Sequence, residues 1–267
     1  MTSTTHARPA RPMTVWRVER LRWWRSHRWV AVVVAFVVCG VAGPLLAEYA
    51  GDLFAGAAGS GIQVVAPTPV PADGIAGFAR SALQIGALVV VITAASGLCV
   101  DARPALAVFY RTRTRRAADL VVPRVLGAAV VAVLGYVIGL GVAWYETVVL
   151  IGAPDVRGLL LGALCALLYL LFLVAVTAAC AASGAGVPLA AGTGIGVILL
   201  LPVLGTVSAL APWLPSRLTS APDDVLHGAA IGDVARSLGV TAVLTVLLVV
   251  AATCSSHRRQ PIENDRS

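Results

Sequence analysis

The side chains best suited to chemistry in this 267-residue chain are gathered in one polar segment, residues 101–124. It reads DARPALAVFYRTRTRRAADLVVPR and combines a cluster of arginines with the apolar side chains of Leu106, Phe109 and Tyr110. Guanidinium groups bind carboxylates through paired hydrogen bonds, and aromatic side chains anchor protein interfaces. The stretch 104–116 therefore predicts a short helix that docks a partner protein. The alternative is that these arginines only orient the chain in a membrane.

Catalytic and metal-binding spacings are missing from the sequence. It contains neither H-E-x-x-H nor G-x-S-x-G, which would indicate a zinc protease or a serine hydrolase. All 20 basic residues are arginine, so the ATP-binding sequence G-x-x-x-x-G-K-[ST] cannot occur, because it needs a lysine. The four histidines, His6, His27, His227 and His257, lie far apart in predicted tails or loops. We therefore predict no enzymatic activity, and no cofactor or metal in this chain.

The composition excludes a water-soluble fold and a disordered chain. Hydrophobic residues make up 58% of the sequence and charged residues only 12%, and the mean hydropathy is +0.88. Soluble domains carry about 25% charged residues, and disordered chains combine high charge with low hydrophobicity. The sequence is that of an integral membrane protein.

Charges divide the chain into apolar runs whose lengths match membrane crossings. Four runs have about 20 residues, which is what a helix needs to cross about 30 Å of hydrocarbon. A fifth run, 158–216, has 59 residues and suits two crossings, with a break at the turn-forming sequence 183–188. Pro202 predicts a kink in the second of these two. The sequence thus predicts an all-α polytopic membrane protein with six spans, at about 29–48, 80–100, 122–146, 157–182, 187–211 and 235–255.

The arginines are distributed unevenly between the two sides of this predicted bundle. Segment 1–28, loop 101–124 and tail 256–267 share one side and hold 16 arginines, whereas the other side holds four. Arginine-rich short loops stay in the cytoplasm, so we expect both termini there. We attribute the lack of lysine to a GC-rich bacterial genome, which predicts a bacterial plasma membrane protein.

The basic segment 1–28 precedes the transmembrane domain, 29–255, and a short tail, 256–267, follows it. Part of the segment reads MTVWRVERLRWWRSHR, and both Arg and Trp suit the headgroup zone of a membrane. This part is either an interfacial helix or only an orientation signal, because its apolar and basic positions are mixed around a helical wheel. Anionic membrane lipid is a sufficient partner for these arginines, and we expect no nucleic acid.

This layout resembles the permease subunit of an ABC exporter of the type 2 (ABC-2) class. Permeases of this class have six spans, cytoplasmic termini and a characteristic loop between the second and third spans. In this chain, Asp101 takes the acidic place of that loop, Ala105-Leu106 stands where Gly-Thr is common, and Arg115-Arg116 takes the middle stretch. Arg124 stands where a lysine is usual. The sequence Trp213-Leu214-Pro215 before the last span also resembles the family.

The resemblance implies an ABC-2-like bundle whose 101–124 loop couples to a separate ATPase subunit, which would bind ATP and Mg²⁺. It also implies a second permease copy or a paralogous permease, with an efflux route between the two. A different interpretation is a non-transporting membrane protein that anchors or regulates a cytosolic partner. The expected coupling residues are Asp101, Arg103, Leu106, Phe109, Tyr110, Arg111, Arg113, Arg115, Arg116 and Arg124.

Overall fold

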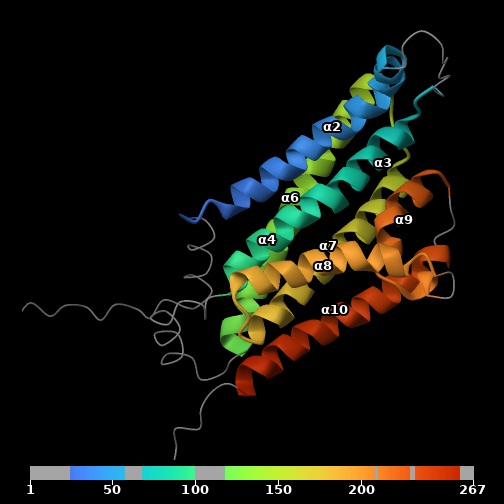
Figure 1. Cartoon of the computed structure of the whole chain (residues 1–267). Coiled ribbons are helices and arrows are strands. Elements are labelled where there is room, and N and C mark those ends of the chain that lie inside the picture. Colours follow the sequence, from blue (N-terminus) through green and yellow to red (C-terminus); the bar gives the residue numbers. More distant parts are fainter. Residues whose placement is uncertain (1–24, 58–67, 100–117, 208–209, 229–231, 259–267) are drawn as a thin grey trace, which may run out of the picture.

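Six long apolar helices, each long enough to cross a membrane, form the body of the protein (Figure 1). The computed structural model describes residues 25–57, 68–99, 118–207, 210–228 and 232–258. All regular secondary structure in these ranges is helical. The prediction of an all-α, multi-pass membrane protein is therefore confirmed at this level.

The second crossing is built from three consecutive pieces, and the other five crossings are single helices. A short 3₁₀ helix, η2, and a short α-helix, α9, join the last two crossings. In chain order the elements are α2 (Arg28–Ala57), α3 (Pro71–Ser81), the π-helix η1 (Ala82–Gly86), α4 (Ala87–Leu98), α6 (Ala118–Leu150), α7 (Val156–Ala182), α8 (Val187–Leu204), η2 (Ala211–Trp213), α9 (Arg217–Leu226) and α10 (Gly232–Arg258).

The second crossing begins earlier than the sequence predicted, at Pro71 rather than at residue 80. Proline suits the first turn of a helix, and the Asp73 carboxylate accepts a hydrogen bond from the Val70 N–H at 2.9 Å. The charges of Asp73 and Arg80 had marked this stretch as a loop. A charged residue can lie within a helix near its end, provided that its side chain reaches water or a counter-ion.

The fifth crossing ends earlier than predicted, so the mid-span position expected for Pro202 is wrong and this proline lies in the last turn of the helix. Helix α8 stops at Leu204, and Gly205 forms its C-terminal cap. The break predicted over 183–188 is present as a turn, in which Gly184 has a φ of +83° that favours glycine.

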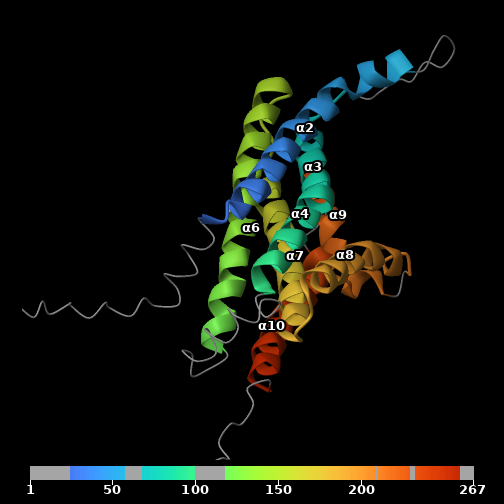
Figure 2. The ribbon, with the colours of Figure 1, turned by 60° about the vertical axis from the view of Figure 1, so that its left-hand side comes forward.

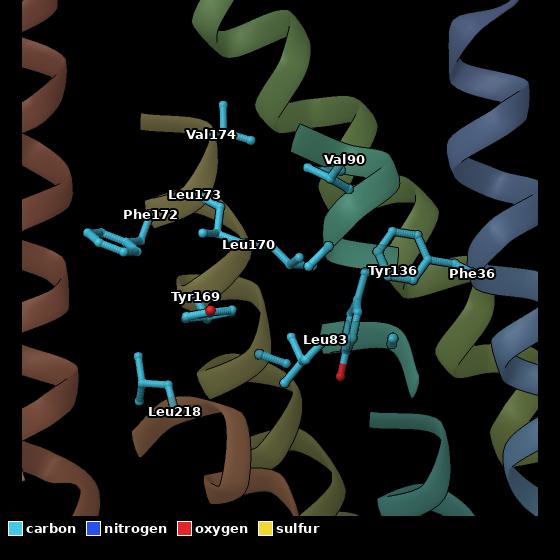
Figure 3. Close-up of a cluster of buried hydrophobic side chains, with 14 of the residues drawn as sticks. Phe36, Leu83, Val90, Tyr136, Tyr169, Leu170, Phe172, Leu173, Val174 and Leu218 are labelled. Carbon is cyan, nitrogen blue, oxygen red and sulfur yellow. The ribbon is translucent and has the colours of Figure 1, made fainter. Parts of the chain in front are cut away.

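Helix α7 is the centre of the bundle, and α8 lies at its margin. In the most apolar 18-residue stretch of each helix, 61% of α7 is buried against 11% of α8. Helix α7 contacts α4, α6, α8, α9 and α10, while α2 packs against α3 and α6 on one side (Figures 1 and 2). Figure 3 shows Tyr169, Leu170 and Leu173 of α7 directed into the core that α7 shares with its neighbours.

Helices α2 and α6 meet through glycines, among them Gly135 and Gly139. A Cβ atom added at Gly139 would lie 2.6 Å from the Phe36 carbonyl oxygen, so only glycine fits this crossing. The Phe36 ring in turn packs edge-on against Tyr136, with ring centroids 5.8 Å apart (Figure 3). Small residues allow the close backbone approach on which helix association in a membrane depends.

Gly158 and Gly162 of α7 allow the short helix α9 to pack closely against α7. A Cβ at Gly162 would lie 3.1 Å from Cα of Pro222. The apolar side chains of α9 face the same way, and Leu218, Ala221 and Val225 are buried. By contrast, a Cβ added at Gly192 or Gly196 of α8 would have no atom of the described chain within 4 Å.

Substituting Gly139 with valine should separate α2 from α6 and destabilise the protein. Overpacking of a close contact costs about 1–3 kcal/mol, and the contact here is with backbone, which cannot rotate away. We expect Gly139→Val to lower the Tm of the purified protein in detergent. Gly141→Val is the matched control on the same helix, because its Cβ meets no described atom within 4 Å. Equal Tm values for the two variants would contradict this role of Gly139.

Candidate functional site

The predicted coupling loop is only partly within the described structure. Nine of its ten residues lie in the undescribed range 100–117, and their roles stay predictions. Arg124 is described and lies in α6, just after Pro123, with only 6% of its surface exposed. A guanidinium is rarely buried to this extent. Of the candidate coupling residues, Arg124 is thus the one that the structure places inside the helix bundle.

The helix ends that flank this loop are tied to other parts of the bundle. Arg28, at the start of α2, donates a hydrogen bond from Nη1 to the carbonyl oxygen of Ser96 at 2.7 Å. Ser96 lies in the last turn of α4, where free carbonyl groups and the helix dipole favour a cation. Ala95 and Cys99 pack against Ala181 and Ala190 of the α7–α8 hairpin. A displacement of the end of α4 would therefore be transmitted to α2 and to this hairpin.

The same end of the bundle carries both ends of the transmembrane domain. Figure 1 shows the start of α2, the end of α4, the start of α6 and the end of α10 at its left-hand side. The segments that continue from these four helix ends are 1–24, the 100–117 range and 259–267. They are the arginine-rich parts of the sequence.

Most hydroxyl groups of the described spans donate hydrogen bonds to the backbone of their own helix. Thr177 donates to the Leu173 carbonyl at 2.8 Å, and Thr241 donates to the Ser237 carbonyl at 2.6 Å. Tyr169 is buried beside the Phe172 ring, with centroids 6.4 Å apart (Figure 3). Hydrogen bonds of this local kind leave little capacity for binding a solute. Thr93, Thr193, Thr206 and Thr245 bond in the same way.

Gln84 differs from these residues because its amide points away from the chain's own bundle. It lies in the π-helix η1, near the middle of the second crossing, and is exposed together with Ile85. A π-turn inserts an extra residue into a helix and changes the direction of the side chains around it. Here it also brings Gly86 against Phe36 of α2, where an added Cβ would lie 2.6 Å from the ring.

A cluster of charged side chains lies at the other end of the bundle, where α9 meets α3. Arg80 of α3 donates to Asp223 of α9 at 2.8 Å, and His227 lies 3.2 Å from Asp73 and 3.1 Å from Asp223. Sequence analysis missed this cluster. The one available signal was the four-residue spacing from Asp223 to His227, because Asp73 and Arg80 lie about 150 residues away in sequence.

This cluster is no metal centre. Within the described ranges, no three His, Cys, Asp or Glu side chains are placed to hold a metal ion. The five cysteines, all of them in the described part of the chain, form no disulfide, and Cys39, Cys99 and Cys165 are buried as packing residues. The structure thus offers two polar regions, one at each end of the bundle, and one isolated amide between them.

Comparisons with protein family models, with curated proteins and with solved structures find no match to this chain. Its function must therefore be argued from its own residues and their geometry.

Substituting Gly162 with valine should lift α9 from α7. The Cβ would press on the Pro222 backbone, and a cost of about 1–3 kcal/mol corresponds to roughly fivefold to 150-fold more frequent opening. Hydrogen exchange with mass spectrometry should show faster exchange across 217–226, with exchange in α2 and α6 unchanged. Gly192→Val is the control, because that position meets no described atom. Unchanged exchange in α9 of the Gly162 variant would contradict the seating of α9 by this glycine.

Proposed function

We propose that this chain is the membrane permease subunit of an ATP-driven exporter of the type 2 ABC class. The observation that carries the proposal is the arrangement of six apolar helices, with an arginine-rich loop between the second and third crossings. The helix ends that flank this loop, in α4 and α6, lie at the same end of the bundle as the start of α2 and the end of α10 (Figure 1). The resemblance of residues 101–124 to the coupling loop of that class supports the assignment.

In this proposal the ATPase partner binds ATP and Mg²⁺, and the permease responds to the force that the ATPase exerts on it. Closure of the ATPase would press on the segment 101–116, which is continuous with α4 and α6. The Arg28–Ser96 hydrogen bond would carry the displacement to α2, and the packing of Cys99 would carry it to the α7–α8 hairpin. Rigid helices can move against one another in a membrane because their backbone hydrogen bonds stay satisfied internally.

Two features support a route formed with a second permease copy. An amide in the middle of a span is costly to expose to lipid, so Gln84 favours a polar or protein environment outside its own bundle. Gly192 and Gly196 give α8 a surface that another helix can approach closely. The cargo would then pass between two copies. An ATPase in the bacterial cytoplasm could reach the 101–124 loop only if this loop and the termini on the same side are cytoplasmic, as the arginine distribution predicts.

Reversing the charge of two loop arginines should uncouple the permease from its ATPase. We expect Arg115→Glu with Arg116→Glu to insert normally but to lose the ATPase partner, because the guanidinium groups would no longer pair with acidic side chains. The measurement is affinity purification from the native host in mild detergent, with mass spectrometry of the co-purifying proteins. The wild type should bring down a polypeptide that contains a Walker A sequence.

A matched control is the pair Arg258→Glu with Arg259→Glu, which has the same charge change outside the loop. It should retain the ATPase. Equal recovery of the ATPase with both double variants would contradict docking by the loop. A wild-type chain that is purified alone, or with a partner that is no ATPase, would favour a membrane anchor instead.

A second prediction concerns the environment of Gln84. In a variant without native cysteines, Gln84→Cys should react with a hydrophilic methanethiosulfonate reagent, because thiols react as thiolates and need water. Val246→Cys, which is exposed near the middle of α10, should react much more slowly if it faces lipid. Equal, slow labelling at both positions would exclude a water-accessible route at Gln84.

A further inference from the structure

The short helix α9 is joined to α3 by a histidine with carboxylates on both sides. His227 caps the C-terminus of α9, and its ring lies between Asp73 at the start of α3 and Asp223 one turn back on α9. Nε2 is 3.2 Å from Oδ1 of Asp73. Nδ1 is 2.9 Å from the Asp223 carbonyl oxygen and 3.1 Å from its Oδ1. Both ring nitrogens thus face hydrogen-bond acceptors.

Only the protonated ring satisfies this arrangement. An imidazolium donates from both nitrogens, whereas a neutral imidazole donates from one and directs a lone pair at an oxygen from the other. The two carboxylates have no hydrogen to offer, and each uses its second oxygen elsewhere. Oδ2 of Asp73 accepts from the Val70 N–H, and Oδ2 of Asp223 accepts from Arg80. Loss of one proton therefore removes one of the two donors and the positive charge that faces both carboxylates, which weakens the contact with Asp73 that joins α9 to α3.

Several other charged groups near α9 have partners of their own. Arg217 pairs with Asp224 on α9 itself at 3.2 Å. On α7, the Asp155 carboxylate accepts from the Gly158 N–H at 2.7 Å, and on α10, Arg236 lies over the Trp213 ring at 6.0 Å. Arg80 is the positive charge closest to the histidine, through their shared Asp223, and its bond to that carboxylate does not depend on His227. Asp73 and Asp223 thus dominate the surroundings of the ring.

We propose that His227, Asp73 and Asp223 form a proton-dependent latch that holds α9 against α3 when the histidine is charged and releases this contact when it is neutral. The apolar face of α9 stays seated on Gly162, so release loosens the helix and does not expel it. Since α9 lies between the fifth and sixth crossings, the latch ties the mobility of their connection to the pH at this end of the bundle. The proposal does not depend on the identity of any transported molecule.

The direction of the pH effect follows from the partners of the ring. The pKa of His227 is raised above its ordinary value of 6.5, first by the hydrogen bond to the Asp223 carbonyl and further by the Asp73 and Asp223 carboxylates, and partial burial opposes this only in part. A group with a raised pKa in the folded state stabilises that state fully at low pH. The stabilisation is lost as the pH rises through the folded-state pKa. The latch is therefore closed in mildly acidic surroundings and open in alkaline ones.

Hydrogen exchange of the purified full chain in lipid nanodiscs tests the latch. Exchange across 217–228 is compared at about pH 5.5 and about pH 8 after correction for the intrinsic pH dependence of exchange, with the core helix α7 as the internal reference. We expect several-fold slower exchange of α9 at the lower pH in the wild type. His227→Gln should exchange rapidly at both values, because glutamine carries no charge. Asp73→Asn should retain only part of the protection at the lower pH.

His27→Asn is the matched control, since it removes a histidine outside α9 at a position where the positive φ of 53° suits asparagine. It should behave like the wild type. Corrected exchange of α9 that is equal at the two pH values in the wild type would overturn the latch. So would a His227→Gln variant that keeps the wild-type pH dependence. A variant that loses protection from exchange in α7 has unfolded. The test of the latch then uses the pH dependence of α9 exchange in the wild type and in Asp73→Asn.

Discussion

Every feature of this protein depends on the cost of leaving a backbone polar group unbonded in hydrocarbon. Within a span no water can satisfy an N–H or a carbonyl group, so each crossing is a helix that bonds its own backbone. The hydroxyl side chains obey the same constraint, because Thr177 and Thr241 donate to carbonyls one turn earlier. Pro71 begins α3 and Pro202 lies in the last turn of α8, whereas Pro44 lies inside α2.

Because lipid is as apolar as a leucine side chain, moving apolar side chains from lipid into the bundle does not by itself stabilise it. Close van der Waals packing between the helices must do so. The contacts of this bundle are concentrated at glycines. Gly139 brings α6 onto the backbone of α2, and Gly162 brings the Pro222 backbone of α9 onto α7. Aromatic rings fill the space between these crossings, with Tyr136 between Phe36 and Phe78. Helix α7 is central because α4, α6, α8, α9 and α10 all pack against it.

Because polar groups are costly to place in hydrocarbon, most charged side chains lie at the two ends of the bundle. One end carries the arginine-rich segments, and the Arg28–Ser96 bond connects the helices from which they extend. The other end carries the ion pairs between α9 and α3. Gln84 is the exception, since its amide lies between the two ends and faces outward. In the proposed permease, the arginine-rich end would receive the force from the ATPase, the other end would hold the pH-dependent contact of α9, and Gln84 would face the route between two copies.

The sequence by itself determined the class of fold, because the lengths of charge-free runs are a local property that the membrane thickness fixes. It also located the break at Gly184 between the fourth and fifth crossings. The ten-residue coupling site stays a prediction, as nine of its residues lie outside the described ranges. Only the tertiary structure decided that α3 begins at Pro71, that α9 sits on Gly162 and that Gln84 faces outward. It alone placed His227 beside Asp73, since contacts between residues 154 positions apart arise from helix packing and leave no periodic trace in the sequence.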